Sequence, residues 1–453
     1  MSHKIEPLRS AVGTINIPAD KSISHRALIL SSVCEGTTKI KNFLSCNDTN
    51  ATMDCLMRLG AKIYRDPDSL AVEGKGLYFP LNNPVKLYAD ESGTTIRVLS
   101  GLLSAQRFST VLDGSVSLRR RPMARVTEPL KKMGARITGS AKEGFKPGFA
   151  GDSYPPLSIL PVKNKLKGVE YRLPVASAQV KSAIMLAALY ADGPTTISEP
   201  YPCRDHTERM LRLFKAKVEV KEKVKEKKAT GAREIVCYPA SKLVSPGELS
   251  IPSDFSSAAF FIVLGLLLKD SEIILKDINL NPTRLGLLNV LKRMGANIEE
   301  IILESGEDRE PRGNLTVKSS NLSGVTVSSG EVPLMIDEIP ILCVAAAAAS
   351  GKMLIKGLSE LKVKETDRIE SILYNLHQVG VKITATPEDA ICVEGGFHCN
   401  KKMDLKSFGD HRTAMSAIIL GTVLDNCYID DVSCIKKSFP DFLSLLESLR
   451  DAK

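Results

Sequence analysis

Seven short segments of the chain combine basic, acidic and hydroxyl side chains in arrangements that could do chemistry on a charged substrate. They are DKSISHR from Asp20, SLRRRPMARV from Ser117, ASAQVKSA from Ala176, MIDEIPIL from Met335, VKETDR from Val363, GDHR from Gly409 and CIKKSF from Cys434. Lysine and arginine bind phosphate and carboxylate groups, and a carboxylate can accept or donate a proton. Because each segment alone also fits a helix cap or a solvated turn, no single segment identifies a site.

The places where these clusters occur favour a common function. Small hydroxyl or acidic residues stand before an apolar run at six positions, which are Ser22, Ser92, Ser177, Ser256, Asp337 and His411. Each pattern predicts a helix start, where free backbone N–H groups and a partial positive charge favour an anion. Five charged clusters lie at or near these starts. Unrelated surface clusters would have no reason to follow them.

Local spacing predicts how some of these side chains are held. We expect Ser22 to cap the first helix, with Lys21 and Arg26 flanking its N-terminus. Lys364 and Arg368 are four residues apart, which predicts that both lie on one helical face of an ion-paired surface turn.

One structural unit is repeated along the chain. Segments similar to LMRLGAKI predict a helix end followed by a strand, and they begin at Leu56, Leu130, Leu211, Leu291 and Leu376. Alternating apolar and polar residues predict six half-buried strands, around Ile40, Val111, Ile197, Ile274, Ile355 and Ile429. The first series lacks a sixth member. We expect the N-terminal strand GTINIP (13–18) to complete that unit, which would bring both chain ends into one domain.

The length of 453 residues is more than one hydrophobic core usually supports. Together with the repeat, it predicts an α/β (α+β) chain of two similar domains. One comprises residues 1–19 plus 252–453 and the other residues 20–251. If the six units form two groups of three, both groups could direct their helix starts at one cleft.

Composition narrows the class of protein. The N-terminus has no apolar stretch typical of a signal peptide, and the longest apolar run, Ala258–Leu268, is too short to cross a bilayer. We therefore expect a cytoplasmic protein with no membrane partner. Ten scattered cysteines without zinc spacing predict buried free thiols and no metal site. Part of the net charge of +9 lies in Lys217–Glu234, which predicts a solvated hairpin, and the rest suits a pocket for small anions.

Taken together, these segments resemble the 5-enolpyruvylshikimate-3-phosphate synthase family. The resemblance runs from about Gly13 to Phe442, and nine motifs follow the family's order: DKSISHR, RRPMARV, ASAQVKSA, RDHTERML, NPTRLGLL, MIDEIPIL, VKETDR, GDHRTAM and SFPDF. It implies two domains, each of three βαβαββ units with pseudo-threefold symmetry, with the active site in the cleft between them. It also implies transfer of the enolpyruvyl (carboxyvinyl) group of phosphoenolpyruvate to the 5-hydroxyl of 3-phosphoshikimate, with release of phosphate and without a metal or organic cofactor.

The resemblance also implies roles for individual residues. Asp337 corresponds to the proton acceptor, Glu365 to the residue that handles the methylene proton, and Lys21 contacts both substrates. The implied 3-phosphoshikimate-binding residues are Lys21, Ser22, Arg26, Ser177, Ala178, Gln179, Asp337 and Lys364. The implied phosphoenolpyruvate-binding residues are Lys21, Gly93, Arg121, Gln179, Arg368, Arg412 and Lys437. The family resemblance further suggests a monomer that acts on small molecules and binds no nucleic acid.

One segment departs from the family pattern. The family usually has GNAGT or GNAAT where this chain has ESGTT, so that Glu91 replaces an asparagine. A carboxylate beside anionic substrates is unfavourable unless it turns away or pairs with a basic neighbour. Gly93 occupies the position where bulk hinders the inhibitor glyphosate in the family, and we expect at least partial sensitivity to glyphosate in competition with phosphoenolpyruvate.

Two other functions stay open at this point. A UDP-N-acetylglucosamine enolpyruvyl transferase would share the fold and the donor, although no segment matches the Cys- or Asp-bearing catalytic loop of that family. A non-catalytic nucleic-acid-binding protein would use the positive charge, although aromatic residues are only 5% of the chain and no recognisable binding motif is present.

Overall fold

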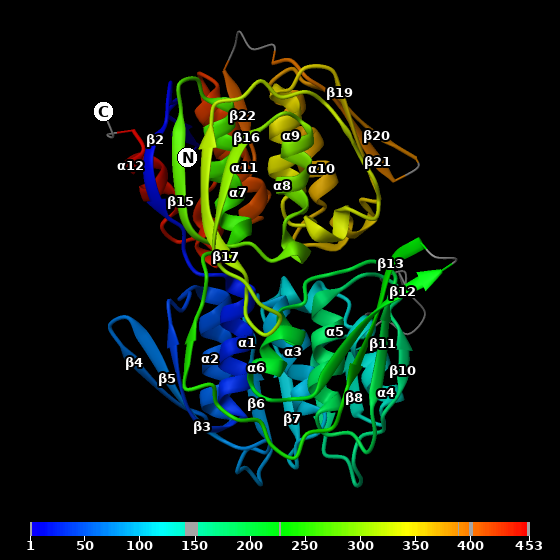
Figure 1. The fold of residues 1–453 in the computed structure, drawn as a ribbon. Coiled ribbons are helices and arrows are strands. Elements are labelled where there is room, and N and C mark those ends of the chain that lie inside the picture. Colours follow the sequence, from blue (N-terminus) through cyan, green and yellow to red (C-terminus); the bar gives the residue numbers. More distant parts are fainter. Residues whose placement is uncertain (1, 141–152, 226–227, 388, 398–401, 451–453) are drawn as a thin grey trace. The chain divides into compact units, whose positions relative to one another are not determined.

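The computed structural model describes residues 2–140, 153–225, 228–387, 389–397 and 402–450 (Figure 1). The chain divides into two compact units. Unit 1 comprises Met1–Pro18, Pro252–Ser305 and Glu310–Lys453, and unit 2 comprises Ala19–Ile251 and Gly306–Arg309. Each unit has its own hydrophobic core, centred on residues such as Phe261 in unit 1 and Leu99 in unit 2. Both chain ends belong to unit 1.

The described part of unit 2 contains three four-stranded sheets with one topology. In each, the second strand is parallel to the first and antiparallel to the third, and the fourth pairs antiparallel with the third. The first sheet is β14 (Glu248–Ser250), β3 (Glu35–Lys41), β5 (Ser69–Lys75) and β4 (Lys62–Asp66). The second is β6 (Val85–Tyr88), β7 (Thr110–Asp113), β9 (Tyr154–Leu160) and β8 (Arg136–Ser140). The third is β10 (Glu170–Arg172), β11 (Thr195–Glu199), β13 (Lys228–Cys237) and β12 (Val218–Lys225).

Unit 1 repeats this topology among its described residues, with one shorter copy. Two sheets have four strands: β2 (Val12–Asn16), β15 (Glu272–Asn279), β17 (Arg312–Lys318) and β16 (Asn297–Glu304), then β18 (Thr326–Val327), β19 (Lys352–Lys356), β21 (Ala390–Glu394) and β20 (Lys382–Thr386). The last has three: β22 (Met403–Leu405), β23 (Cys427–Ile429) and β1 (His3–Ile5). The second strand of each sheet is one of the six alternating segments, so the predicted repeat and the mixed α/β class are confirmed.

The N-terminal strand does not complete the sixth unit as we expected. GTINIP supplies β2, which pairs in parallel with β15 of the fourth unit. The shorter strand β1 pairs antiparallel with β23 instead. Alternation in GTINIP buries Ile15 and Ile17 in the core of unit 1, but the central strands of two sheets in this unit, β15 and β23, each pair with a segment from the N-terminus. A pattern of alternation predicts a strand and its buried face without choosing between them.

Helices follow the strands in each unit. Those of unit 2 are α1 (Lys21–Ser32), α2 (Asn47–Arg58), α3 (Gly93–Leu103), α4 (Ala124–Lys132), α5 (Ala178–Ala188) and α6 (His206–Leu213). Those of unit 1 are α7 (Phe255–Leu267), α8 (Gly286–Arg293), α9 (Ile339–Ala348), α10 (Arg368–Gln378), α11 (His411–Val423) and α12 (Phe442–Ser448). The 3-10 helices are η1 (Leu118–Arg120), η2 (Pro282–Arg284), η3 (Val332–Leu334), η4 (Ser359–Val363) and η5 (Ser433–Lys437).

The helices at the six predicted starts, α1, α3, α5, α7, α9 and α11, are buried almost all round and pack on neighbours within their unit. In unit 2, α3 contacts α1 and α5, and in unit 1, α7, α9 and α11 contact one another (Figure 1). Gly101 allows the close approach of α3 to α5, because a Cβ there would clash with the carbonyl oxygen of Ala183. Each unit therefore gathers three helix starts that the chain places far apart in sequence.

Two local predictions about the helix starts were wrong. The cap of α1 is Asp20, whose carboxylate accepts from the backbone N–H of Ile23 at 2.9 Å, and Ser22 lies inside the first turn. An acidic side chain one position earlier caps as well as serine does, so the sequence alone did not decide between them. Lys364 directly follows η4, and Asp367 caps α10, so Lys364 and Arg368 do not share a helix.

Two predictions are confirmed within the described residues, namely the Lys217–Glu234 hairpin and the buried free thiols. Lys217–Glu234 forms the hairpin β12–β13, apart from residues 226–227, which lie outside the described part. Nine of the ten cysteines are described, and all nine are free thiols, eight of them buried. Among the described residues, no helix is both long and apolar enough to cross a bilayer.

Candidate functional site

The start of α1 places three of the predicted binding residues together in unit 2. Lys21 Nζ lies 2.9 Å from Asp48 Oδ2 in the first turn of α2, and both side chains are largely buried. Arg26, one turn further along α1, donates to the carbonyl oxygen of Ser22 at 2.8 Å and is only 4% exposed. Two cations thus lie at one helix start, where the helix dipole also favours an anion.

The starts of α3 and α5 are joined by an arginine and a glutamine. Arg97 donates to the side-chain carbonyl of Gln179 at 2.8 Å, and Gln179 donates to Thr94 Oγ1 at 2.9 Å. The Gln179 amide is therefore fixed by two hydrogen bonds. Ser177 precedes α5 without a side-chain capping bond, and Ala178 is the first residue of the helix.

A buried chain of polar side chains connects α1, α2 and the start of α3. His25 Nδ1 lies 2.7 Å from Thr52 Oγ1, which lies 2.6 Å from Thr95 Oγ1, and Thr95 donates to the Ser92 hydroxyl at 2.7 Å. Burial lowers the pKa of His25 to about 3, so the imidazole is neutral at pH 7. The chain fixes the N-terminus of α3 without adding charge.

Arg368 organises the charged residues of unit 1. Its guanidinium, 1% exposed, contacts Asp337 at 3.1 Å, Glu365 at 2.9 Å and Asp410 at 2.9 Å. Burial by itself lowers the pKa of Arg368, but Asp410, Glu365 and Asp337 together raise it above its ordinary value. The prediction that VKETDR forms an ion-paired turn on the surface was therefore wrong, because Arg368 is buried among these carboxylates.

Arg412 and Lys437 extend the group at the start of α11. Arg412 Nε lies 3.8 Å from Asp337 Oδ1, and its NH1 lies 3.9 Å from Glu338 Oε1. Lys437 Nζ donates to the carbonyl oxygen of Gly409 at 3.4 Å. Lys364 is half-buried and directly precedes Glu365. Three carboxylates, those of Asp337, Glu365 and Asp410, thus share one arginine, with further cations nearby.

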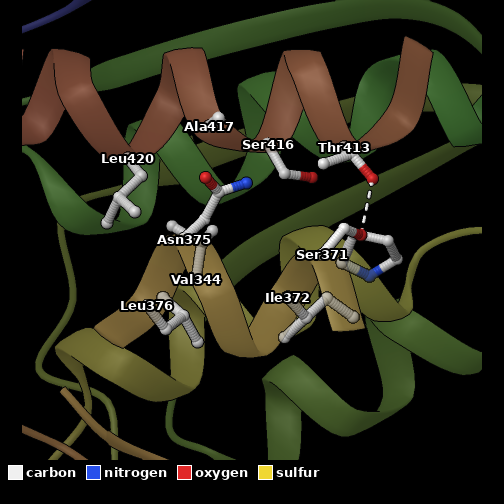
Figure 2. A pocket seen from close by; sticks show the side chains of 10 residues that line it. Val344, Ser371, Ile372, Asn375, Leu376, Thr413, Ser416, Ala417 and Leu420 are labelled. Carbon is white, nitrogen blue, oxygen red and sulfur yellow. Dashed lines mark hydrogen bonds between the residues drawn. The ribbon is translucent and has the colours of Figure 1, made fainter. Parts of the chain in front are cut away.

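A small pocket lies between α9, α10 and α11, lined in part by residues that follow Arg368 and Arg412 in the sequence (Figure 2). Its polar side includes Ser371, whose hydroxyl donates to the carbonyl oxygen of Arg368 at 3.0 Å and lies 3.1 Å from Thr413 Oγ1. Apolar side chains such as Ile372 and Leu420 line much of the remainder. These contacts tie α10, one turn beyond Arg368, to Thr413 of α11, the residue after Arg412.

Comparison with known proteins assigns the chain to a family. A sequence model of the EPSP synthase family, 3-phosphoshikimate 1-carboxyvinyltransferase, matches residues 5–446. The chain belongs to the EPSP synthase family. Proteins named 3-phosphoshikimate 1-carboxyvinyltransferase from Thermoanaerobacter sp. (strain X514) and Petrotoga mobilis are 43% and 44% identical, each aligned over 99% of this chain and 100% of the relative.

Solved structures agree with this assignment. EPSP synthase from Acinetobacter baumannii matches with a TM-score of 0.82 and 37% identity, over 99% of this chain and 98% of the other. The enolpyruvyl transferase NikO from Streptomyces tendae matches with a TM-score of 0.72 over 99% of this chain and 97% of the other. At 14% identity, the NikO comparison supports the fold alone. The comparisons support EPSP synthase and neither of the two alternative functions.

The structure therefore places the residues expected for an EPSP synthase in two groups. The unit 2 group comprises Lys21, Ser22, Arg26, Gly93, Arg121, Ser177, Ala178 and Gln179, at or near the starts of α1, α3, α4 and α5. The unit 1 group comprises Asp337, Lys364, Glu365, Arg368, Arg412 and Lys437, at or near the starts of α9, α10 and α11. Glu91, which departs from the EPSP synthase pattern, is half-buried in the turn before α3.

Several residues that hold the side chains of the candidate site were not predicted from the sequence. Arg97 contacts Gln179, Asp48 pairs with Lys21, and Asp410 pairs with Arg368. Arg97 lies one turn into a predicted helix start, as Arg26 does, and that shared position was an available signal. Asp410 stands in the charged segment GDHR, but nothing in the sequence indicated the partner of Asp410 or of Asp48, because both partners are distant in sequence.

Gly93→Ala is expected to weaken the binding of phosphoenolpyruvate. A Cβ at Gly93 would lie 2.9 Å from Arg121 NH1 and 3.3 Å from Arg97 NH1. Guanidinium groups can shift, so the fold should tolerate the methyl group while the implied phosphoenolpyruvate ligand Arg121 moves. We expect KM for phosphoenolpyruvate to rise about tenfold, the scale of one charged hydrogen bond. The thermal midpoint should be unchanged, and steady-state kinetics showing an unaltered KM would contradict this prediction.

Proposed function

We propose that the chain transfers the carboxyvinyl group of phosphoenolpyruvate to the 5-hydroxyl of 3-phosphoshikimate and releases phosphate, with Asp337 as base and Glu365 as acid. The family assignment supports the reaction. The observation that carries the residue roles is that Asp337 and Glu365 contact one buried arginine, Arg368, which orients both carboxyl groups. Addition of an alcohol to this double bond requires both a base and an acid. Arg368 contacts a candidate for each role.

The chemistry needs both groups because the enol ether carbon of phosphoenolpyruvate is not electrophilic until its methylene carbon is protonated. Glu365 would donate that proton while Asp337 accepts the proton of the attacking hydroxyl. In the second step the methyl group returns a proton to Glu365 and the double bond re-forms, as phosphate leaves with the proton that Asp337 had accepted. Lysine and arginine side chains stabilise the departing phosphate.

Arg368 provides a way to couple substrate binding to the charge of Glu365. The guanidinium lies 2.9 Å from the Glu365 carboxylate, and its positive charge favours the ionised form of that carboxylate. A phosphoenolpyruvate carboxylate that binds Arg368 competes with Glu365 for this cation. Glu365 then takes up a proton more readily, and the acid is formed when the donor substrate is present.

The remaining cations and amides are proposed to bind the substrates. We assign 3-phosphoshikimate to Lys21, Ser22, Arg26, Ser177, Ala178, Gln179, Asp337 and Lys364. We assign phosphoenolpyruvate to Lys21, Gly93, Arg121, Gln179, Arg368, Arg412 and Lys437. Helix starts and fixed side chains such as Gln179 support these assignments, because preformed donors bind anions without a large ordering cost.

We further propose that the enzyme works as a cytoplasmic monomer. Free cysteines support the location, because thiols persist in a reducing compartment. The family resemblance of the sequence supports the monomer.

A phosphate-release assay tests the reaction. Purified protein with phosphoenolpyruvate is given 3-phosphoshikimate in one sample and UDP-N-acetylglucosamine in the other. We expect release with 3-phosphoshikimate alone. Release with the nucleotide sugar, or salt-dependent DNA binding with no release from either mixture, would contradict the proposal.

A further inference from the structure

The motif RDHTERML (204–211) has no role in the chemistry proposed above, yet its central residue contacts a predicted ligand of the substrate. Thr207 is the second residue of α6 and is 2% exposed. Its hydroxyl accepts a hydrogen bond from Arg26 Nε at 2.7 Å. Helix α6 packs against α1, which carries Arg26.

Ser182 on α5 completes the contact with the same edge of the guanidinium. Arg26 NH2 donates to Ser182 Oγ at 2.7 Å, and Ser182 donates to the carbonyl oxygen of Ala178 at 2.6 Å. Thr207 Oγ1 lies 2.7 Å from Ser182 Oγ. Since the Ser182 hydrogen is directed to Ala178, Thr207 must donate to Ser182. Every hydrogen of the two hydroxyl groups is then assigned, and the Nε and NH2 edge of Arg26 has one permitted orientation.

A buried ion pair fixes the separation of the two hydroxyl groups. Lys181 precedes Ser182 and Glu208 follows Thr207, and Lys181 Nζ lies 2.6 Å from Glu208 Oε1 with both side chains at most 2% exposed. The pair therefore joins α5 to α6 next to the two hydroxyls. Arg26 meets a preformed acceptor pair in the core of unit 2.

We propose that Thr207 and Ser182 are positioning residues for substrate recognition: they orient Arg26 toward 3-phosphoshikimate and, through Ala178, hold the start of α5 in register with it. This inference rests on the proposed function, which assigns Arg26 and Ala178 to that substrate. Neither hydroxyl is required to touch the substrate. Their loss should therefore alter the affinity for 3-phosphoshikimate more than the chemical step.

The test is a set of isosteric substitutions with steady-state kinetics for both substrates. Thr207→Val keeps the shape and removes the acceptor for Arg26 Nε. KM for 3-phosphoshikimate should rise roughly 10- to 100-fold, the cost of losing a hydrogen bond to a charged group. KM for phosphoenolpyruvate and kcat should stay within about threefold of wild type. Thr207→Ser should restore KM, because it returns the hydroxyl.

A second variant and a matched control separate positioning from general destabilisation. Ser182→Ala removes the other acceptor within a helix that favours alanine, and it should raise the same KM even if Thr207→Val does not fold. Thr195→Val is the control, because the buried Thr195 hydroxyl has no hydrogen-bond partner among the described residues. Its kinetics should match wild type.

Coupling to Arg26 supplies a readout that a purely structural role would not produce. Lysine lacks the Nε and NH2 donors, so Thr207→Val should cause little further loss in an Arg26→Lys background.

Wild-type protein that releases no phosphate with 3-phosphoshikimate would overturn the proposed function. Active wild-type protein whose Thr207→Val and Ser182→Ala variants keep KM, or lose both substrates equally, would overturn this inference alone.

Discussion

Asp337→Asn is expected to lower kcat at least about a hundredfold while leaving the dissociation constant of 3-phosphoshikimate within a few-fold of wild type. The amide keeps the size of the carboxylate and can still accept from Arg368 NH1, which lies 3.1 Å from Asp337 Oδ1. It cannot accept the proton of the substrate hydroxyl. Stopped-assay kinetics and calorimetric titration measure the two quantities separately.

Asp404→Asn is the matched control for this experiment. Asp404 lies on β22, is largely exposed and pairs with Lys402 at 2.9 Å, so the same change in charge occurs away from the proposed chemistry. Its kcat should equal that of wild type. An Asp337→Asn enzyme with near-normal kcat would remove Asp337 from the role of base.

Lys181→Met is expected to destabilise the protein by about 3–5 kcal/mol at pH 7, the usual cost of leaving a buried charge unpaired. Lys181 lies 2.9 Å from Glu199 and 2.6 Å from Glu208, and all three side chains are at most 2% exposed. Burial by itself lowers the pKa of Lys181, but Cys203, Glu208 and Glu199 raise it well above its ordinary value. The lysine is therefore charged, and its loss leaves two buried glutamates without a cation.

The loss in Lys181→Met should depend on pH. Burial raises the pKa of Glu208 even in wild type, although Lys181 opposes the shift. Without Lys181 this pKa rises further. A carboxyl group whose pKa is higher in the folded state stabilises the fold below its unfolded pKa, and that contribution is lost as pH rises through the folded pKa. The deficit relative to wild type should therefore be largest at neutral pH and shrink toward pH 5.

Lys131→Met provides the comparison for this measurement. Lys131 and Glu128 form an exposed pair at 3.7 Å on α4, so the change in net charge is the same but water screens the loss. We expect a cost below about 1 kcal/mol. Urea unfolding at several pH values checks both variants. A Lys181→Met deficit that equals the Lys131→Met cost, or that does not vary with pH, would contradict the account.

The sequence predicted the repeat well because local patterns define it. Alternation around Ile274 and Ile355 marks two central strands, and the small residues that close LKRMGANI and LHQVGVKI mark the transitions from helix to strand. The partner of GTINIP was not predictable in this way, because strands β15 and β23 each pair with a segment near the N-terminus. Tertiary packing determines that GTINIP pairs with β15.

Prediction of the candidate site had the same limit. Helix starts and charged clusters identified Lys21, Asp337 and Arg412 as candidates. They did not reveal that Arg368 is buried, because its contact with Asp410 joins residues 42 positions apart. The hydroxyl pair on Arg26 was equally hidden, since Thr207 and Ser182 resemble ordinary helix residues until α1, α5 and α6 pack together. The sequence showed which residue types could act at the site, whereas their hydrogen-bond partners could be identified only from the folded structure.

Product analysis with phosphoenolpyruvate labelled with carbon-13 in its methylene group tests the central claim most directly. Incubation with 3-phosphoshikimate should yield one equivalent of phosphate for each equivalent of a labelled enol ether. Carbon-13 magnetic resonance should place the labelled vinyl group on the oxygen at carbon 5. Phosphate release accompanied by labelled pyruvate, with no ether formed, would show a phosphatase and would contradict the proposed transfer.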